Sequence, residues 1–295
     1  MTKEVILHFS KPGLLTSVQD QGRIGYQAFG VPQAGALDRP AARLANEILY
    51  NPPNTPVLEI TLLGPRITFS GKCQIALCGA DLSPKRNEED CPMYETVEMR
   101  EGDVLRFGRV VSGCRVYLAI RGEWQLKPWL GSYSYAAQNG QVLTPDSLIK
   151  RNSSLRILPQ PYVPKRICPL QERPNFPSSQ RIRVLPGPEF ETFSNYAVGH
   201  FFSQAFTVTT DSNRMGYRLA ERLRDFNPEK EVISSGIVPG TIQITNAGQP
   251  IVLLADAQTS GGYPRLANVL QEDMAKLAQL KPGDQVIFSL VELEP

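Results

Sequence analysis

The 295-residue sequence is poor in histidine and has no long apolar run. The two histidines, His8 and His200, lie in unrelated settings, so the sequence offers neither a histidine-rich metal site nor an evident Ser-His-Asp triad. No apolar run approaches the roughly 20 residues that a membrane helix needs. The N-terminal residues, Met-Thr-Lys-Glu-Val-Ile-Leu-His, lack the apolar core of a signal peptide. We therefore expect no metal site and no membrane association.

Cysteine is also scarce. The five cysteines are odd in number and are never spaced as Cys-x-x-Cys; they are Cys73, Cys78, Cys91, Cys114 and Cys168. This pattern fits reduced thiols better than a disulfide framework, and it therefore favours a cytoplasmic location.

Charge of one sign does not predominate, because 31 basic and 29 acidic side chains leave a net charge of +2. Without a basic stripe, nucleic acid is not expected as the main partner. Gly71-Lys72 lacks the remainder of a phosphate-binding loop, and no Met-Lys-Met is present to carry biotin. Ser147 and Lys150 have Ser-x-x-Lys spacing without its companion motifs, so we interpret that spacing as chance.

Short strands separated by turns dominate the pattern that is present. One clear helix is predicted from Asp38, a typical N-cap, to a stop at Asn51-Pro-Pro. After it, strand patterns alternate with Gly-containing or charged turns, which indicates a barrel or sandwich. A proline-rich stretch then predicts an extended linker. The predicted parts are an N-terminal β-domain (1–158), the linker (159–180) and a C-terminal β-domain (181–295).

Four short motifs occur in the same order in both halves of the chain. They are Arg23-Ile-Gly-Tyr26 with Arg214-Met-Gly-Tyr217, Gly30-Val-Pro with Gly236-Ile-Val-Pro, Ile75–Asp81 with Ile251–Asp256, and Glu101-Gly-Asp103 with Lys281-Pro-Gly-Asp284. Four ordered matches predict two homologous β-domains. We interpret each Gly-Asp motif as a hairpin turn. The Arg-x-Gly-Tyr loops leave two alternatives open: the arginine braces the loop through carbonyl groups, or it presents its guanidinium to a carboxylate or phosphate.

The stretch 248–264 combines a buried strand with a polar, glycine-rich loop. The apolar run from Ile251 to Ala255 is typical of a strand that is buried on both faces. It ends at Asp256, and Gln-Thr-Ser-Gly-Gly-Tyr-Pro follows at 258–264. Such a loop offers side-chain donors and acceptors together with a backbone that can approach a ligand closely. The alternative is a plain polar turn, for which Gly-Gly-Tyr-Pro is equally suitable.

Motifs along nearly the whole chain are shared with a known family. They include Thr-Ser-Val-Gln-Asp-Gln-Gly-Arg-Ile-Gly-Tyr (16–26), Gly-Ala-Leu-Asp (35–38), Leu-Glu-Ile (58–60), Arg-Met-Gly-Tyr-Arg-Leu (214–219) and the loop at 258–264. They resemble subunit 2 of the allophanate hydrolase family, which also includes the C-type subunit of 5-oxoprolinase and the carboxyltransferase domain of urea carboxylase. The resemblance implies a mainly β fold of two tandem cyclophilin-like β-barrel domains with a few short helices.

The resemblance also implies a function within a complex. It indicates a component of an ATP-dependent 5-oxoprolinase, which opens a small cyclic amide to give glutamate. The expected partners are proteins like the smaller B-type and the A-type subunits of 5-oxoprolinase, and ATP would serve the complex although this chain has no nucleotide motif. Two alternatives stay open: the carboxyltransferase component of a biotin-dependent urea carboxylase, with biotin on a separate carrier, or a non-catalytic regulator that binds its partner subunit.

Substrates of that family share an N–C=O group, whose oxygen gains negative charge on attack and is stabilised by preorganised donors. The arginines are then candidate anion binders, the carboxylates candidate bases, and the loop glycines candidate amide donors. The catalytic candidates are Asp20, Arg23, Glu59, Arg214 and Asp256. The substrate-binding candidates are Asn46, Gln258, Thr259, Gly261, Gly262 and Tyr263.

The sequence departs from the family pattern between Gly131 and Leu148. Tyr133 stands where the family tends to carry an arginine, and Gln138-Asn-Gly-Gln replaces a glycine-rich stretch. The sequence therefore leaves the identity of the substrate open.

Overall fold

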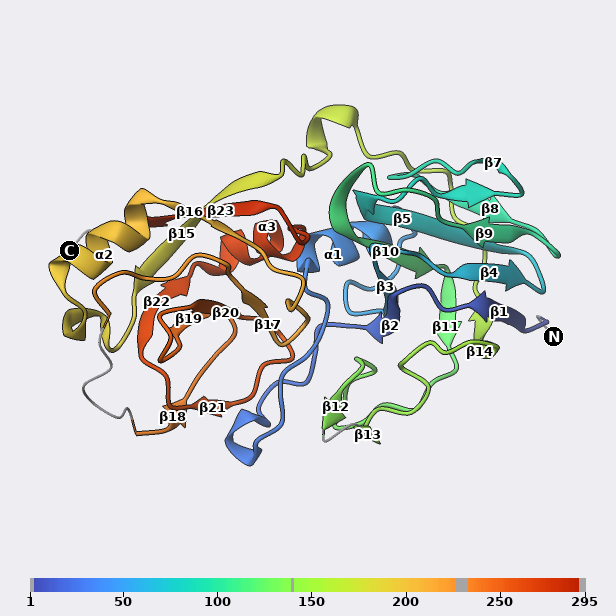
Figure 1. Ribbon diagram of the computed structural model, residues 1–295. Helices are drawn as coiled ribbons and strands as arrows, with labels where there is room; N and C mark the ends of the chain where they lie inside the picture. The colour runs from blue at the N-terminus through green and yellow to red at the C-terminus, as the bar shows by residue number, and fades with distance from the viewer. Residues whose placement is uncertain (1–2, 139–140, 227–232, 292–295) are drawn as a thin grey trace. The chain divides into compact units, whose positions relative to one another are not determined.

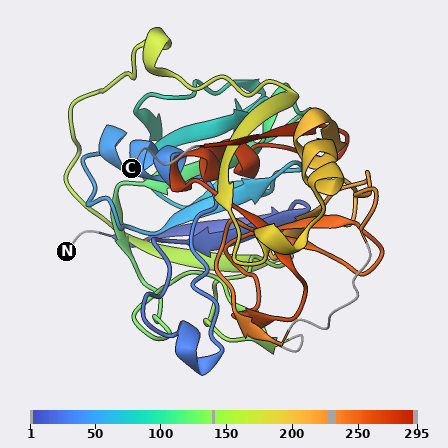
Figure 2. The same ribbon diagram turned by 90° about the vertical axis from the view of Figure 1, so that its left-hand side faces the viewer.

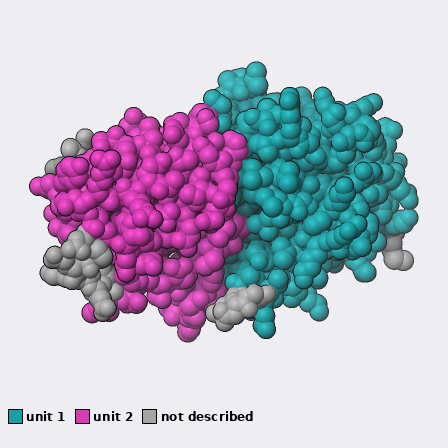
Figure 3. Space-filling view, viewed as in Figure 1, with its two compact units in different colours: residues 1–23, 34–176 teal, residues 24–33, 177–295 magenta. Residues whose placement is uncertain are grey.

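The computed structural model describes residues 3–138, 141–226 and 233–291. Its elements are mainly β-strands with a few short helices (Figure 1), which confirms the predicted fold class. Two compact units divide the chain and are coloured separately in Figure 3. Unit 1 comprises Met1–Arg23 and Ala34–Phe176, and unit 2 comprises Ile24–Gln33 and Pro177–Pro295. The segment 24–33 therefore belongs to the second unit although it lies near the N-terminus.

Unit 1 contains two larger sheets and one short ribbon. In sheet order, the seven-stranded sheet is β11 (Gly122–Trp124), β14 (Ser153–Pro159), β1 (Val5–Lys11), β4 (Arg66–Phe69), β9 (Val104–Arg106), β6 (Lys85–Arg86) and β7 (Glu89–Asp90). The five-stranded sheet is β2 (Leu15–Gln19), β3 (Val57–Thr61), β10 (Ser112–Ile120), β5 (Cys73–Asp81) and β8 (Val97–Met99). The ribbon pairs β12 (Ala137–Gln138) with β13 (Gln141–Val142).

One apolar cluster joins both sheets of unit 1 and forms its core. Alternation along β1 buries Val5, Leu7 and Phe9 while His8 stays exposed. The strands β5 and β10 are buried on both faces, because a second cluster packs a helix against their other side. Their almost continuous apolar sequence reflects this double burial.

That helix is α1 (Arg39–Ile48), and it begins where the sequence predicts. Asp38 is the N-cap, since its Oδ1 accepts a hydrogen bond from the Ala41 amide at 3.0 Å. Pro40 occupies the first turn, where its missing N–H leaves no hydrogen bond unmade. The amide of Asn51 donates to the carbonyl of Asn46 just beyond the helix.

Part of the predicted linker packs along unit 1. The side-chain amide of Gln74 exchanges two hydrogen bonds of 2.9 Å with the backbone of Val163. The Cys168 amide donates to the Tyr94 carbonyl at 2.8 Å, and η2 (Leu170–Glu172) follows. Proline-rich composition predicts extended chain here, but it gives no sign of these contacts.

Unit 2 is built on one seven-stranded sheet. In sheet order, its strands are β16 (Ala205–Thr207), β23 (Gln285–Leu290), β15 (Ser179–Pro186), β22 (Arg265–Val269), β19 (Thr241–Ile244), β20 (Pro250–Leu253) and β17 (Gly216–Arg218). β15 and β23 run parallel, and the other named pairs of this sheet are antiparallel. A separate ribbon pairs β18 (Ser235–Gly236) with β21 (Ser260–Gly261).

An aromatic cluster lies in the core of unit 2 beside α2 (Asn195–Ser203), which packs against β23 (Figures 1 and 2). The rings of Phe201 and Phe288 stack with 4.9 Å between their centroids. Ser194 caps α2 by accepting a hydrogen bond from the Ala197 amide at 3.1 Å. The remaining helical elements of this unit are η1 (Gln27–Phe29), η3 (Phe190–Thr192), η4 (Gln271–Asp273) and α3 (Met274–Ala278).

Asp273 precedes α3, but its side chain does not cap the helix. Its Oδ2 accepts hydrogen bonds from the backbone amide and Nε of Arg183 at 2.8 and 2.9 Å, and its Oδ1 lies 2.8 Å from Nζ of Lys276. Burial opposes ionisation of this carboxyl, but the hydrogen bonds from Arg183 and Lys276 outweigh burial and lower its pKa to about 2. Asp273 is a typical N-cap residue by sequence, but here its carboxylate ties α3 to β15 instead.

The two Gly-Asp motifs form the same turn in both units. In unit 1, Gly102 has φ of 87° and Oδ2 of Asp103 accepts from the amide three residues earlier at 2.9 Å. In unit 2, Gly283 has φ of 91° and Oδ2 of Asp284 makes the same bond at 3.1 Å. These aspartates are thus turn residues, as the sequence predicts, but the turns are not hairpins. The first joins β8 to β9 (strands of different sheets), and the second joins α3 to β23.

Candidate functional site

Arg23 lies inside unit 1, with 1% of its surface exposed. Its Nη2 donates to the Ser134 carbonyl at 2.6 Å and to Oγ1 of Thr144 at 2.8 Å. The guanidinium also lies over the ring of Trp129, 4.9 Å from its centroid. In this structure Arg23 therefore braces the polypeptide around Trp129 and Thr144, which is the first of the two alternatives for its loop.

Asp20 also binds the segment that Arg23 contacts, between Trp129 and Thr144. Its Oδ1 accepts hydrogen bonds from the Gly22 amide at 2.8 Å and from Oγ of Ser132 at 2.7 Å. Its Oδ2 accepts from the Tyr133 amide at 2.7 Å. A carboxylate engaged in this way serves to fix the loop. The segment that Asp20 and Arg23 hold is the one that departs from the family pattern; Asn139 and Gly140 within it lie outside the described residues.

Glu59 is buried on β3 in a polar network beside α1. Its Oε2 accepts from the Leu37 amide at 2.9 Å and from the Tyr117 hydroxyl at 2.8 Å. Its Oε1 lies 3.6 Å from Nε of Arg115. Burial, reinforced by the neighbouring Glu59 carboxylate, raises the pKa of Tyr117 well above its ordinary value. The network holds the chain at the start of α1, because the Tyr117 hydroxyl also accepts from the Asp38 amide at 2.8 Å.

Arg214 and Asp256 form a two-pronged ion pair in unit 2. Nε and Nη2 of Arg214 lie 2.8 Å from Oδ2 and Oδ1 of Asp256, respectively. The side chains are only 4% and 14% exposed. This planar pairing uses the geometry that suits a guanidinium best, and it ties the loop that leads into β17 to the chain that follows β20.

Asn46 is likewise buried, with 1% of its surface exposed. Its Nδ2 donates to the Thr55 carbonyl at 2.8 Å, and its Oδ1 accepts from Nδ2 of Asn51 at 3.1 Å. Like both arginines, it is buried and makes hydrogen bonds to fixed partners inside its unit. Such burial argues against direct contact of Arg23, Arg214 or Asn46 with a substrate, so a functional role for them stays a prediction.

The remaining candidates are adjacent in the 258–263 loop of unit 2. Gln258, Gly262 and Tyr263 are exposed, and Thr259 and Gly261 are partly buried. Within the described part of the chain, neither the side chains of Gln258 and Tyr263 nor the Gly262 amide have a hydrogen-bond partner. This loop therefore presents an amide side chain, a phenol and a backbone N–H to solvent within six consecutive residues.

The loop is held by a ribbon and an ion pair. Gly261 in β21 pairs with Ser235 in β18, so the ribbon fixes the backbone of the loop at this point. The Ile237 amide donates to the Thr259 carbonyl at 3.0 Å. Arg265 supports β18 by donating from Nη1 to the Gly236 carbonyl at 3.0 Å, while its Nε lies 2.7 Å from Oε2 of Glu189. The hydrogen bond from Arg265 lowers the pKa of Glu189.

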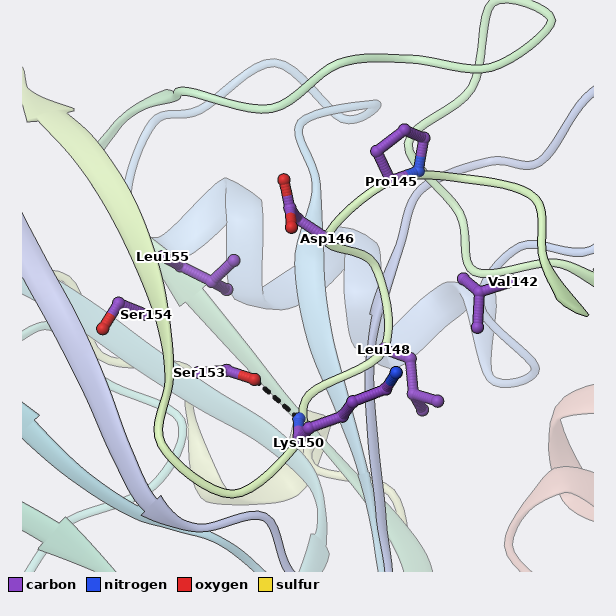
Figure 4. A pocket seen from close by; sticks show the side chains of 8 residues that line it. All are labelled: Val142, Pro145, Asp146, Leu148, Lys150, Ser153, Ser154 and Leu155. Atoms are coloured by element: carbon purple, nitrogen blue, oxygen red, sulfur yellow. Dashed lines mark hydrogen bonds between the residues drawn. The ribbon is translucent and has the colours of Figure 1, made fainter.

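A separate pocket of about 260 Å³ opens on unit 1, and Figure 4 shows its lining. It is formed by Val142, Pro145, Asp146, Leu148, Lys150, Ser153, Ser154 and Leu155. The side chains of Asp146 and Lys150 point in different directions in this view, and none of the sequence-predicted site residues lines the pocket. Ser147 is buried and donates to the Thr144 carbonyl at 2.7 Å, so the Ser-x-x-Lys spacing does not form a nucleophile pair.

In residues 3–138, 141–226 and 233–291, no three His, Cys, Asp or Glu side chains gather in a metal-binding arrangement. None of the helices described in those ranges has the length and apolar character to cross a membrane.

Comparison with known proteins places the chain among related sequences. The family described as carboxyltransferase domain, subdomain A and B, matches residues 29–290. The chain is 35% identical over 289 residues to the C-type subunit of 5-oxoprolinase from Escherichia coli, covering 98% of this chain and 92% of that protein. It is 31% identical to the subunit of the same name in Haemophilus influenzae, covering 94% of this chain and 89% of that protein. The crystal structure of Kluyveromyces lactis urea carboxylase is similar with a TM-score of 0.89 at 30% identity, over 97% of this chain and 27% of that one.

Proposed function

Since this chain belongs to the family of carboxyltransferase domains, subdomain A and B, we propose that it works as one component of an ATP-dependent 5-oxoprolinase complex. Relatives named as the C-type subunit of 5-oxoprolinase indicate a part of a hydrolase complex. The observation that carries the finer proposal is the likeness to those subunits over nearly the full length of both chains. The proposed reaction opens the lactam of 5-oxoproline and yields glutamate.

The 258–263 loop is the part of the chain that we assign to the substrate. Attack on an amide carbonyl transfers negative charge to its oxygen, and donors that are already aimed at that oxygen lower the barrier. The Gly262 amide and the side chains of Gln258 and Tyr263 are exposed and unbonded among the described residues, so they can donate to such an oxygen. We assign to this loop the binding and orientation of the amide.

ATP is proposed as a cosubstrate of the complex. This chain has no glycine-rich phosphate loop, so the partners, proteins like the smaller B-type and the A-type subunits of 5-oxoprolinase, are assigned most of the nucleotide contacts. The three candidate carboxylates of this chain, Asp20, Glu59 and Asp256, are engaged in structural hydrogen bonds. We therefore assign the general base to a partner as well.

The proposal is tested by reconstituting the complex from this chain and the two candidate partners. With 5-oxoproline and ATP, we expect glutamate and ADP to form in equal amounts. Gln258→Ala and Tyr263→Phe should each lower kcat/KM by about 10- to 100-fold, at or below the range for loss of an oxyanion donor. Gln285→Ala, at an exposed position of β23, is the matched control and should leave kcat/KM unchanged. A pure complex that releases neither product contradicts the proposal.

Carboxyl transfer is the second candidate function. It is favoured by the structural likeness to urea carboxylase, although this chain spans only 27% of that protein. The chemistry requires biotin on a separate carrier, because this sequence has no Met-Lys-Met. Turnover of urea or another amide on addition of a carboxybiotin carrier, with no ATP-dependent opening of 5-oxoproline, would establish this function instead. If loop variants bind the partner normally and no reaction is found, a non-catalytic binding role is favoured.

A further inference from the structure

Gln243 lies directly beneath the 258–263 loop. It is a central residue of β19 and only 1% of its surface is exposed. A Cβ atom placed on Gly261 would come within 2.8 Å of Nε2 of Gln243 and within 3.1 Å of Cδ1 of Ile237. The same Nε2 donates to the Tyr263 carbonyl at 3.4 Å. One buried side-chain amide therefore contacts the loop at two of its backbone positions.

The position of Gln243 follows from the alternation along β19. Ile242 and Ile244 are fully buried on one face of the sheet, so Thr241 and Gln243 point to the opposite face. There, Ile237, Leu253 and Ala257 form a small apolar cluster. The loop is thus seated on the second face of the unit 2 sheet, with Gln243 as the polar group at the contact.

A glutamine at this position requires an explanation, because burying a side-chain amide is unfavourable unless its polar atoms are bonded. An apolar side chain of similar length would fill the same space at no such cost. The bond of 3.4 Å to Tyr263 is longer than the usual N–H···O hydrogen bond of about 2.7 to 3.2 Å, so hydrogen bonding alone does not account for the buried amide. The amide adds two features that an apolar side chain lacks. Its flat surface fits against Gly261, which has no side chain, and its N–H group faces the carbonyl of Tyr263.

We propose that Gln243 is a positioning residue that sets the backbone from Gly261 to Tyr263. It packs closely against Gly261 and donates to the Tyr263 carbonyl. These two contacts orient the Gly262 amide and the Tyr263 side chain. The consequence for turnover rests on the proposed function of the loop. The consequence for the loop's conformation does not, so the two can be tested apart.

Hydrogen exchange on the full chain alone tests the conformational part. In Gln243→Met, which keeps the length of the side chain but removes the donor, we expect the amides of 258–263 that are protected by pairing with β18 to exchange at least about 5-fold faster. The matched control is Gln249→Met in the same unit, because Gln249 also donates from Nε2 to a backbone carbonyl, that of Leu219 at 2.8 Å. The control should leave exchange in 258–263 unchanged. Unchanged exchange in Gln243→Met, or in Gln243→Asn if the first variant does not fold, overturns the proposal.

A double variant tests whether Gln243 sets the conformation of the loop through its contact with Gly261. Gly261→Ala should disturb the loop because its methyl group meets the Gln243 amide. Adding Gln243→Ala removes that obstacle, so in the double variant the effect of Gly261→Ala on loop exchange should fall by at least about half. If Gly261→Ala changes loop exchange by the same amount with glutamine or with alanine at position 243, the contact between Gln243 and Gly261 does not position the loop.

Kinetics in the reconstituted complex then separate this inference from the proposed function. For Gln243→Met we expect KM for 5-oxoproline to rise by about 5- to 20-fold while kcat changes less, because a misplaced loop binds the amide poorly before it reacts. A folded variant with faster loop exchange and unchanged KM contradicts a positioning role in this reaction. If the wild-type complex has no 5-oxoprolinase activity, the proposed function fails, and the exchange data still decide whether Gln243 positions the loop.

Discussion

Arg23 and Arg214 stand in similar tetrapeptides, yet they bind different partners. Arg23 donates to the carbonyl of Ser134 and stacks on an indole ring, whereas Arg214 pairs with the carboxylate of Asp256. The tetrapeptide shows only that a guanidinium is present, because its partners come from segments far along the chain. At the residue scale, the sequence therefore identifies the polar residues of interest, and the fold determines which of them reach solvent.

The ion pair of Arg214 yields a stability prediction. Arg214→Ala leaves the Asp256 carboxylate, 14% exposed, without its charged partner, and we expect a loss of about 2 to 4 kcal/mol in the free energy of unfolding of unit 2. Arg214→Lys should lose less, because it keeps the charge but not the two-pronged geometry. Arg218→Ala, at an exposed position on β17, should change stability by less than about 0.5 kcal/mol. Urea denaturation measures all three, and equal effects of the first and last variants would contradict the assignment.

The cysteines yield a reactivity prediction. All five are buried and free, and burial raises the pKa of Cys73 to about 12 and that of Cys91 to about 11. Since the thiolate is the reactive form, native thiols should be inert. With Ellman's reagent at pH 8 we expect no rapid labelling of the folded chain and labelling of all five thiols in denaturant. Rapid modification of any thiol in the native chain would contradict the structure there.

Elements with local signals are the ones that sequence predicts well. The cap at Asp38 and the apolar spacing behind it locate α1, and Gly-Asp locates two turns of the same construction. In contrast, α2 is not identified from its residues, because Asn-Tyr-Ala-Val-Gly-His-Phe-Phe-Ser has a glycine in the middle and no clear polar face. Its formation depends on Phe201, which packs in an aromatic cluster.

The attachment of α3 yields a prediction of pH dependence. Asp273 has its pKa lowered in the folded state to about 2, from 3.8, so its stabilising effect is fully present above about pH 4 and is lost as the pH falls towards 2. A shift of this size corresponds to about 2 kcal/mol. We therefore expect Asp273→Asn to be less stable than wild type by about this amount at pH 6, with the difference vanishing near pH 2.

The control for that measurement is Asp211→Asn, which changes an exposed carboxylate of the same unit. It should differ little from wild type at every pH. Thermal unfolding without denaturant, followed by circular dichroism between pH 2 and 6, gives the comparison. A stability difference for Asp273→Asn that stays constant across this range would show that the carboxylate is not held by Arg183 and Lys276.

At the scale of the molecule, each unit has apolar clusters of its own. Those of unit 1 are built on β1, β5, β10 and α1, and unit 2 carries an aromatic core and a smaller cluster under the 258–263 loop. The chain does not divide between the units at one point, because 24–33 belongs to the second. The sequence predicts two β-domains, one after the other along the chain. The assignment of the ten residues 24–33 to the second unit leaves no signal in composition.

Separate cores predict separable unfolding. Both tryptophans, Trp124 and Trp129, lie in unit 1, so tryptophan fluorescence reports on that unit, while far-ultraviolet circular dichroism reports on both. Arg214→Ala should lower the transition of unit 2 seen by circular dichroism and leave the fluorescence midpoint within about 1 °C of wild type. A fluorescence midpoint that falls in parallel with the circular dichroism would show that the two units unfold together.

The sequence by itself determined the mainly β class, the start of α1, the Gly-Asp turns and the family. These follow from signals that lie within a few consecutive residues or in long shared motifs. Only the tertiary structure decided that Arg23, Asp20 and Glu59 are buried, and that Gln243 lies under Gly261. The physical reason is that exposure depends on the segments that cover a residue, and the carbonyl that binds Arg23 lies 111 residues away along the chain.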